Sequence, residues 1–394
     1  MPNPTLQVQQ KRFAGASFPD RDGAGTLTAR ERRQGRKPMR IDAAGLTAFV
    51  RDIFMREGCS LAEAERIGRF LVAANLTGHD SHGVIRVPRY VAWLRDGELV
   101  ADQTPEVAID GGAFALVDAK YGFGQTAAPF ATDLGIAKAK EHGVSVIALR
   151  HAGHIGRIGE WAERAAAAGL VSTHYVNVAG SLLVAPFGSV ERRFSTNPVA
   201  AGFPVPGADP IILDFATSAV AEGKVLVASQ GGKPLPGDVL IEPDGRLSAD
   251  PITLYGPLDG PERDNQKGAG AIRAFGEHKG SGLSLMCELL AGALTGSGTA
   301  GPGKRQVCNG MLSLYLTPQA FGSDEAIAAE ARAYLEFFKT ARPAPGGEVL
   351  LPGEPERRMR AARLAEGVSL PDPVWETLLV AGRPHGLDGD AYRA

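Results

Sequence analysis

The sequence predicts an α/β protein in which strands and helices alternate along most of the chain. Short apolar runs typical of buried strands are separated by helix-like segments. The length of 394 residues allows two lobes, and 44% hydrophobic with 22% charged residues is typical of globular proteins. The net charge of −2 offers no positive field for nucleic acid or an anionic membrane, so small-molecule chemistry is the expected activity.

The first 40 residues differ from the rest. They are polar, rich in arginine around residues 30–36 and without apolar periodicity, which predicts a disordered or dispensable tail over residues 1–40. Their acidic residues do not fit an organelle-targeting segment. Met39 directly precedes the first periodic segment, so we expect the natural chain to begin there.

Two helices are expected after the tail. Apolar residues recur at helical spacing over 41–58, and Ser60 and Glu63 have the spacing of a capping box for a second helix that ends near Thr77. This helix leads into the polar segment 78–83. A loop on such a rigid support is a common place for catalytic groups.

Strand-like and helix-like segments alternate through the middle of the chain, and helices close it. The expected strands cover 114–117, 144–149, 170–176, 199–203 and 211–213, and the expected helices cover 127–140, 158–168, a buried segment at 281–294, and 324–340, 355–366 and 373–381.

Three cysteines, Cys59, Cys287 and Cys308, lack the paired spacing of a zinc site and the density of a disulfide scaffold. They are expected to be reduced thiols. No stretch approaches the roughly 20 apolar residues that span a bilayer, and the chain does not start with an apolar signal-peptide core. The protein is therefore predicted to be cytoplasmic, without a membrane partner.

The segment 122–127 has the G-x-G-x-x-A pattern of a dinucleotide-binding turn, because it follows a strand-like run and precedes a helical one. The acidic residue that should hold the ribose about 20 positions later is missing, since the next strand ends at Arg150 and His151. Arg150 would suit a 2′-phosphate. A tight turn into a packed helix explains the pattern better, so no Rossmann site is assigned.

Two histidine pairs, His79 with His82 and His151 with His154, are each spaced by three residues. On a helix this spacing would suggest metal ligation, but the flanking glycines argue against helices. A zinc site would also need a further ligand from a distant residue such as His174. No metal is therefore predicted, and proton transfer is the better use of these imidazoles.

Carbonyl reduction needs a proton donor with a pKa near neutrality, and histidine is the side chain closest to that value. A 2-oxo acid also carries a carboxylate, for which arginine is the preferred two-pronged partner. His82 and Arg86 are four residues apart and would converge if the segment begins a helix. Taken alone, the local spacing is explained better by a surface histidine beside a salt-bridged arginine.

Several further stretches rich in glycine, proline and small polar residues are typical either of ligand-facing loops or of plain turns. Together, the motifs resemble the type-2 malate/L-lactate dehydrogenase family, which includes ureidoglycolate, sulfolactate and diketogulonate oxidoreductases and reductases of cyclic imino acids. The resemblance spans about residues 41–386. Its motifs are D-S-H-G-V-I-R-V-P-R-Y at 80–90, G-H-I-G at 153–156, A-P-F-G at 185–188, T-N-P at 196–198, D-F-A-T-S at 214–218, G-K-V at 223–225, H-K-G-S-G-L at 278–283 and L-P-G-E at 351–354.

This resemblance implies a family-specific, non-Rossmann malate/L-lactate dehydrogenase-like α/β fold, with a mixed sheet and a helical N- and C-terminal lobe. It implies a substrate lobe over 41–120 and 320–394, an α/β cofactor-binding lobe over 121–319, and a homodimer whose chains complete each other's sites. The implied activity is hydride transfer between NAD or NADP and C2 of a small 2-hydroxy or 2-oxo acid. A cyclic imino acid reductase and a noncatalytic dinucleotide-binding paralogue are the alternatives.

The resemblance also implies roles for single residues. His82 looks like the group that exchanges a proton with the substrate, and Arg86 like the carboxylate clamp, although some family members use the histidine matching His154 for proton transfer. Ser81 and Thr196 are expected to line the substrate pocket. The residues expected to bind the dinucleotide are Asp214, Phe215, Ala216, Thr217, Ser218, His278, Lys279, Gly353 and Glu354.

The chemistry of the expected cofactor residues is suitable. Backbone amides of small-residue loops and a lysine such as Lys279 suit a pyrophosphate, and carboxylates accept ribose hydroxyls. A solvated surface lysine and, for Glu354, a helix-end charge are the alternative explanations. One residue departs from the family pattern, because Ser281 stands where an aromatic side chain is common.

Overall fold

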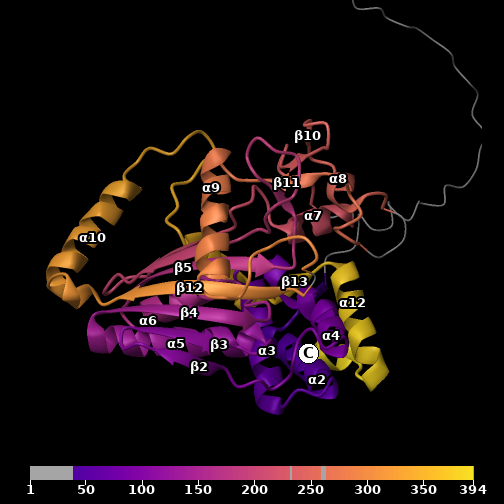
Figure 1. Cartoon of the computed structure of the whole chain (residues 1–394), viewed down its shortest axis with the longest axis horizontal. Coiled ribbons are helices and arrows are strands. Elements are labelled where there is room, and N and C mark those ends of the chain that lie inside the picture. The colour runs from indigo at the N-terminus through magenta and orange to yellow at the C-terminus, as the bar shows by residue number, and fades with distance from the viewer. Residues whose placement is uncertain (1–38, 231–232, 259–262, 305, 394) are drawn as a thin grey trace, which may run out of the picture. The chain divides into compact units, whose positions relative to one another are not determined.

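A seven-stranded sheet with the order β2-β3-β4-β12-β5-β7-β8 forms the centre of the protein (Figure 1). The computed structural model describes residues 39–230, 233–258, 263–304 and 306–393. Of the neighbouring strands, β3 and β4 are parallel and the other pairs are antiparallel, so the sheet is mixed, as predicted. The strands are β2 (Glu106–Asp110), β3 (Phe114–Asp118), β4 (Val144–Ala152), β5 (Val171–Ala179), β7 (Val199–Phe203), β8 (Ile211–Phe215) and β12 (Cys308–Leu316).

Two helices cover one face of this sheet. Helix α5 (Gly124–His142) is the crossover between the parallel strands β3 and β4, and α6 (Gly159–Ala167) packs beside it. Both place alanines against a buried cluster that includes Ile147, Leu149 and Val176. Helix α5 begins directly at the G-F-G segment. The interpretation of that segment as a turn into a packed helix is therefore confirmed.

The other face of the sheet carries α9 (His278–Cys287), which continues as a π-helix at Glu288–Ala293. Asn177 follows the inward-facing Val176 and so points to this opposite face, where its amide donates to Glu288 at 3.2 Å. The predicted helix at 281–294 is present, but the expectation that it is buried was wrong. Its apolar side chains are partly solvated, with Leu285 50% and Leu294 68% exposed.

The N-terminal helices share a core with the end of the chain. This core unites α2 (Ala43–Arg56), α3 (Leu61–Leu76) and α4 (Val87–Arg95) with α12 (Asp372–Gly382). Strand β1 (Met39–Ile41) pairs with β13 (Val368–Leu370). The last two residues of the predicted tail, Met39 and Arg40, thus belong to a strand, and residues 1–38 lie outside the described residues.

The predicted capping box of α3 is half formed. The Ser60 hydroxyl accepts from the Glu63 amide at 3.4 Å, as expected for an N-cap. The Glu63 carboxylate, however, does not return to the Ser60 amide. It accepts from Thr126 at 2.9 Å, while the Ser60 amide donates to Asp102 at 2.8 Å. The second half of the box is replaced by tertiary contacts.

A smaller sheet with the order β10-β9-β11-β6 has a core of its own, which includes Val184, Leu240 and Ile272.

The described residues contain no helix long and apolar enough to cross a membrane. Strands β2 and β3 fall within the predicted 41–120 lobe and belong to the central sheet. The lobe division at residue 120 stays a prediction. The remaining elements are β6 (Val184–Ala185), α7 (Glu222–Ser229), β9 (Leu240–Ile241), β10 (Leu247–Ser248), α8 (Ile252–Tyr255), β11 (Ala271–Arg273), α10 (Asp324–Lys339) and α11 (Glu354–Glu366).

Candidate active site

The predicted catalytic segment forms two consecutive 3-10 turns, Asp80–His82 and Val84–Arg86, at the end of α3. His82 and Arg86 were expected to converge if this segment began a helix. They instead lie in two separate 3-10 turns. Gly83 separates the turns, and a Cβ at this position would lie 2.2 Å from the Asn75 Oδ1 atom. That same oxygen accepts from the Val84 amide at 2.9 Å. Glycine is therefore needed for the close approach of the turns to α3.

Asp80 anchors these turns to the C-terminal part of the chain. Its carboxylate accepts from both terminal nitrogens of Arg363 on α11, at 2.6 and 3.0 Å, and from the Asn75 amide at 2.6 Å. Two-pronged pairing of this kind restrains both position and orientation. The first residue of the D-S-H-G motif thus has a structural role, whereas the following two residues face the site.

Ser81 brings His82 and Arg86 together without a helix between them. Its hydroxyl lies 2.9 Å from His82 Nδ1, and its carbonyl accepts from Arg86 Nε at 2.6 Å. Gly223, the first residue of the G-K-V motif, packs directly against Ser81, where a Cβ would be 2.4 Å from the serine Cβ. Three predicted site residues therefore share one hydrogen-bonded unit.

His154 joins this unit from the end of β4. Its ring stacks on that of His82, with centroids 5.5 Å apart and planes at 19°. Its Nδ1 atom lies 2.5 Å from the Tyr90 hydroxyl, and the Gln125 amide donates to the same hydroxyl at 3.1 Å. Gln125 donates to this hydroxyl, and His154 Nδ1 is the described contact that can accept the hydroxyl proton. We therefore assign Tyr90 as the donor to Nδ1 and place the His154 proton on Nε2.

Burial keeps both imidazoles neutral. The pKa of His82 is held well below its ordinary value, first by loss of solvent and then by the neighbouring His154 and Arg86. Burial, together with the charge of Arg86, lowers the pKa of His154 to about 3. At neutral pH each ring therefore offers one hydrogen-bond donor and one acceptor.

The G-F-G segment contributes to this site through packing. A Cβ on Gly124 would lie 2.3 Å from the carbonyl oxygen of His154, which is too close for any side chain. In addition, the Gly153 amide donates to the Gly122 carbonyl at 2.8 Å. The N-terminus of α5 thus lies against the turn that carries His154. Both glycines therefore serve the position of this histidine.

A cavity of about 500 Å³ opens beside Arg86. Ser81 and Arg86 line it, whereas His82 and His154 do not. Glu222, at the first position of α7, lines it as well and lies 3.7 Å from the Arg86 guanidinium. Burial acts to raise the pKa of Glu222, but the charges of Arg86 and Arg89 and hydrogen bonds to the carboxylate together outweigh it. The pKa is therefore lowered, and this carboxylate is ionised. It also accepts from the Tyr255 hydroxyl at 2.6 Å.

Thr196, the other predicted substrate residue, is joined to the predicted cofactor segment. Its carbonyl accepts from the amide and hydroxyl of Thr217, at 3.0 and 3.1 Å. The adjacent Asn197 has a φ of +31° and donates to the buried Glu288 at 2.9 Å. No described contact joins Thr196 to His82 or Arg86.

The five residues 214–218 follow one another at the end of β8. Asp214 accepts from the Gly159 amide at 2.9 Å at the start of α6, and burial raises the pKa of its carboxyl. The Phe215 ring packs edge-on against Phe275, at 5.4 Å between centroids. Ala216 and the buried Thr217 follow Phe215 in the sequence. The hydroxyl of Ser218 donates to the Val220 carbonyl at 2.8 Å.

Two other predicted cofactor segments reach this strand from either side. The Phe275 amide donates to the Thr217 carbonyl at 3.0 Å, and α9 begins three residues later with the exposed His278 and Lys279. From the other side, the Ile212 amide donates to the Pro352 carbonyl at 3.2 Å, one residue before Gly353. The structure therefore gathers these segments around β8.

Gly353 and Glu354 form the turn that starts α11. Gly353 has a φ of +92°, which only glycine adopts at low cost. The Glu354 carboxylate accepts from Lys339 at 2.5 Å and from the Leu351 amide at 2.8 Å. Lys339 lowers the pKa of Glu354. These contacts close the turn. They fit the alternative explanation of Glu354 as a charge at a helix end.

Sequence reasoning missed Arg157, whose side chain is only 2% exposed. Its Nη2 atom lies 2.6 Å from Glu163, while its Nε and Nη1 atoms have no hydrogen-bond partner among the described residues. A Cβ on Gly159 would be 2.6 Å from Arg157 Nη1 and 2.7 Å from Asp214 Oδ2, so both groups meet at this glycine. Arg157 directly follows the G-H-I-G motif, and this position was the signal in the sequence that could have identified it.

Tyr90, Gln125 and Glu222 were also not assigned a role in advance. Each lies within or next to a recognised motif, and this adjacency was the only signal in the sequence. His174, considered as a metal ligand, is buried in the central sheet, and its ring bonds Ser313 at 2.8 Å and Ser172 at 3.0 Å. Its hydrogen-bonding capacity is therefore used within the sheet.

Known proteins are similar to this chain along most of its length. A family model described as malate/L-lactate dehydrogenase matches residues 41–379. Hydroxycarboxylate dehydrogenase B of Escherichia coli (strain K12) is 37% identical over 90% of this chain and 97% of that protein. The Delta(1)-pyrroline-2-carboxylate/Delta(1)-piperideine-2-carboxylate reductase of Pseudomonas putida is 34% identical over 84% of this chain and 94% of that protein. The solved structure of sulfolactate dehydrogenase from Methanocaldococcus jannaschii has a TM-score of 0.77 at 29% identity, covering 90% of this chain and 99% of that one.

Proposed function

The chain belongs to the malate/L-lactate dehydrogenase family of oxidoreductases, and from this premise we propose that it interconverts a small 2-hydroxy acid and its 2-oxo acid with NAD or NADP. The observation that carries the proposal is the unit of His82, His154 and Arg86, in which two neutral imidazoles stack beside a guanidinium. Proton transfer and carboxylate binding are the two functions that such a reaction requires from the protein.

His82 is the better candidate for proton transfer. Its Nδ1 atom faces the Ser81 hydroxyl, which can donate or accept, so either ring tautomer is satisfied. His154 faces the Tyr90 hydroxyl, which is already committed as a donor to its Nδ1 atom. In this scheme neutral His82 accepts the hydroxyl proton during oxidation, and the Nε2–H of His154 donates a hydrogen bond to the substrate oxygen.

Arg86 serves as the carboxylate clamp in this proposal. Its Nε atom is held by the Ser81 carbonyl, which leaves its terminal nitrogens toward the cavity that Ser81 and Arg86 line. Glu222 lies 3.7 Å away and is farther than a hydrogen bond, so it leaves room for a substrate carboxylate to bind the guanidinium. Thr196 remains a candidate pocket residue next to the cofactor segment.

A nicotinamide dinucleotide, when bound, supplies the hydride acceptor or donor at its C4 atom. Residues 214–218, His278, Lys279, Gly353 and Glu354 would hold it. The residues present fit such a ligand, because buried Arg157 has unpaired nitrogens beside Asp214, and a pyrophosphate or ribose oxygen would satisfy them. Exposed Lys279 adds a second positive charge from α9.

The test is the change in 340 nm absorbance with NADH and NADPH, against 2-oxo acids, 2-hydroxy acids and cyclic imino acids. We expect turnover with at least one 2-oxo or 2-hydroxy acid. Turnover only with cyclic imino acids would favour the second candidate, which the 34% identity to a pyrroline/piperideine-2-carboxylate reductase supports. Dinucleotide binding without any turnover would favour a noncatalytic paralogue.

We further propose that the protein is a cytoplasmic homodimer. Exposed apolar side chains gather on α9 with its π-helical extension and on α10, a helix that lies apart from the central sheet in Figure 1. They are Leu285, Met286, Leu289, Leu294, Tyr334, Phe337 and Phe338. Light scattering of the purified protein tests this, with twice the chain mass expected. The three free, buried cysteines support a reducing compartment.

A further inference from the structure

We propose that His151 is a positioning residue, whose left-handed backbone conformation turns the end of β4 so that His154 reaches Tyr90. The inference rests on the proposed role of His154 in the reaction. It assigns a function to the first histidine of the H-A-G-H segment, which the proposed mechanism does not use.

Strand β4 contains an irregularity at this residue. Asn309 of β12 pairs with Ala152, whereas Met311 pairs with Leu149, so two steps along β12 match three steps along β4. Within this interval His151 has a φ of +50°, a value that residues other than glycine adopt rarely. Extra residues of this kind bend a strand and redirect the side chains that follow, often beside active sites.

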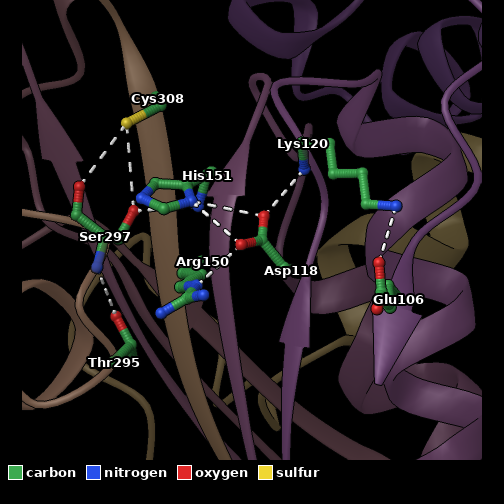
Figure 2. A network of polar contacts seen from close by, with 8 residues as sticks. All are labelled: Glu106, Asp118, Lys120, Arg150, His151, Thr295, Ser297 and Cys308. Carbon is green, nitrogen blue, oxygen red and sulfur yellow. Dashed lines mark hydrogen bonds and ion pairs between the residues drawn. The ribbon is translucent and has the colours of Figure 1, made fainter. Parts of the chain in front are cut away.

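Contacts on both sides hold His151 in this conformation. Figure 2 shows its ring between Asp118 on one side and Ser297 with Cys308 on the other. Nδ1 lies 3.2 and 3.3 Å from the two Asp118 oxygens, and the His151 amide donates to the Ser297 hydroxyl at 3.2 Å. The ring stacks on Tyr121 at 5.0 Å, and the Tyr121 amide donates to the His151 carbonyl at 2.7 Å. The surrounding structure therefore determines the strained backbone.

Only Ala152 and Gly153 separate His151 from His154. The backbone of His154 and Ile155 is also held by hydrogen bonds. The Ile155 amide donates to Asn309 Oδ1 at 3.0 Å, and the His154 carbonyl accepts from Gln125 at 3.3 Å. Because the chain is fixed on both sides of this short stretch, a change of φ at His151 has to be absorbed within residues 152–154, and we infer that it would displace the His154 ring from the Tyr90 hydroxyl.

Three substitutions separate the backbone from the imidazole. His151→Gly and His151→Asn permit the left-handed conformation and should keep most of the wild-type kcat, whereas His151→Val disfavours it. A displacement of about 1 Å at a catalytic group can cost roughly 100-fold in rate, so we expect a kcat loss of that order for His151→Val, with little change in KM. Equal losses in all three variants, or none in His151→Val, would overturn the inference.

A double-mutant cycle tests the route through Tyr90. If His151→Val acts by withdrawing His154 from Tyr90, then adding Tyr90→Phe should cost little more, because the contact is already lost. Independent, multiplicative losses would overturn the route. Should His151→Val not fold, His151→Ala is the second variant. Its Cβ disfavours the left-handed conformation less severely than a β-branched side chain does, and we expect its kcat to lie below that of His151→Gly without a rise in KM.

Two further variants complete the design. Asp102→Val is the matched control, since Asp102 also has a positive φ of +56° but lies in the helical lobe, and it should lower the melting temperature without changing kcat. His154→Ala separates the inference from the proposed function. A fully active His154→Ala would overturn the proposed role of His154. An inactive His154→Ala beside an active, folded His151→Val would overturn the positioning role of His151 alone.

Discussion

The Tyr90 hydroxyl lies 2.5 Å from Nδ1 of His154, a histidine 64 residues further along the chain, and its assignment as the donor places the ring proton on Nε2. Gln125 completes the series by donating to the same hydroxyl. Tyr90 is buried, and burial raises the pKa of its phenol, so it stays protonated and remains a donor throughout the physiological range. The ring of His154 is therefore oriented by a group that does not titrate.

Tyr90→Phe should lower kcat by about 10-fold, because it leaves a buried imidazole nitrogen without its donor, at a cost of about 1–3 kcal/mol. Steady-state kinetics with the substrate found in the absorbance assay would measure this. Phe54→Leu is a suitable control, since Phe54 packs on Tyr90 with ring centroids 6.4 Å apart and does not line the cavity. An unchanged kcat in Tyr90→Phe would remove Tyr90 from the site.

His82→Ala should lower kcat by roughly 100- to 10,000-fold, which is the usual contribution of general acid–base catalysis. Binding of the dinucleotide, followed by fluorescence titration, should be much less affected. Full activity in this variant, together with an inactive His154→Ala, would transfer the proton-transfer role to His154.

Arg86→Lys should raise KM for the carboxylate substrate by roughly 10- to 100-fold, because lysine keeps the charge but loses the two-pronged geometry. The Nε contact to the Ser81 carbonyl would also be lost. Arg95→Lys, an exposed arginine on α4 that does not line the cavity, provides the comparison. Equal effects of the two substitutions would argue against a specific clamp.

Gly124→Ala should reduce both stability and kcat. The added methyl group would lie 2.3 Å from the His154 carbonyl, and backbone must move to relieve this contact. Overpacking of this kind costs about 1–3 kcal/mol, which thermal unfolding would detect. Gly301→Ala is the control, since a Cβ there meets no atom closer than 3.9 Å. A Gly124→Ala variant with wild-type kinetics would contradict the packing role of this glycine.

Replacing His174 should flatten the pH dependence of stability. Burial lowers the pKa of His174 from 6.5 to about 3, so between these values the unfolded chain binds a proton that the folded chain does not. The free energy of unfolding therefore falls as the pH drops below 6.5, by up to about 1.4 kcal/mol per pH unit from this group. Urea unfolding of the wild type and His174→Gln at pH 7, 6 and 5 would measure it. Equal slopes would show that His174 does not contribute.

The sequence alone was sufficient for much of the fold, because local patterns determine local structure. The apolar periodicity over residues 41–58 and the alternation from 114 to 213 predicted helices and strands that the structure contains. Periodicity did not predict solvent exposure at 281–294. That segment is helical as predicted, yet Leu285 and Leu294 face outward, since burial depends on what packs against a helix and not on its own sequence.

The motifs of the site and their order can be taken directly from the sequence, and they indicate the family and the residues to consider. Which of these residues come together depends on the fold. The register of β4 against β12, and the approach of α5 at Gly124, bring His154 to Tyr90 and His82. Arg157 and Asp214 both approach Gly159 from positions 57 residues apart, and Glu222 pairs with Arg86 across 136 residues of sequence. Such contacts arise from the packing of whole elements, and no local pattern in one chain encodes them.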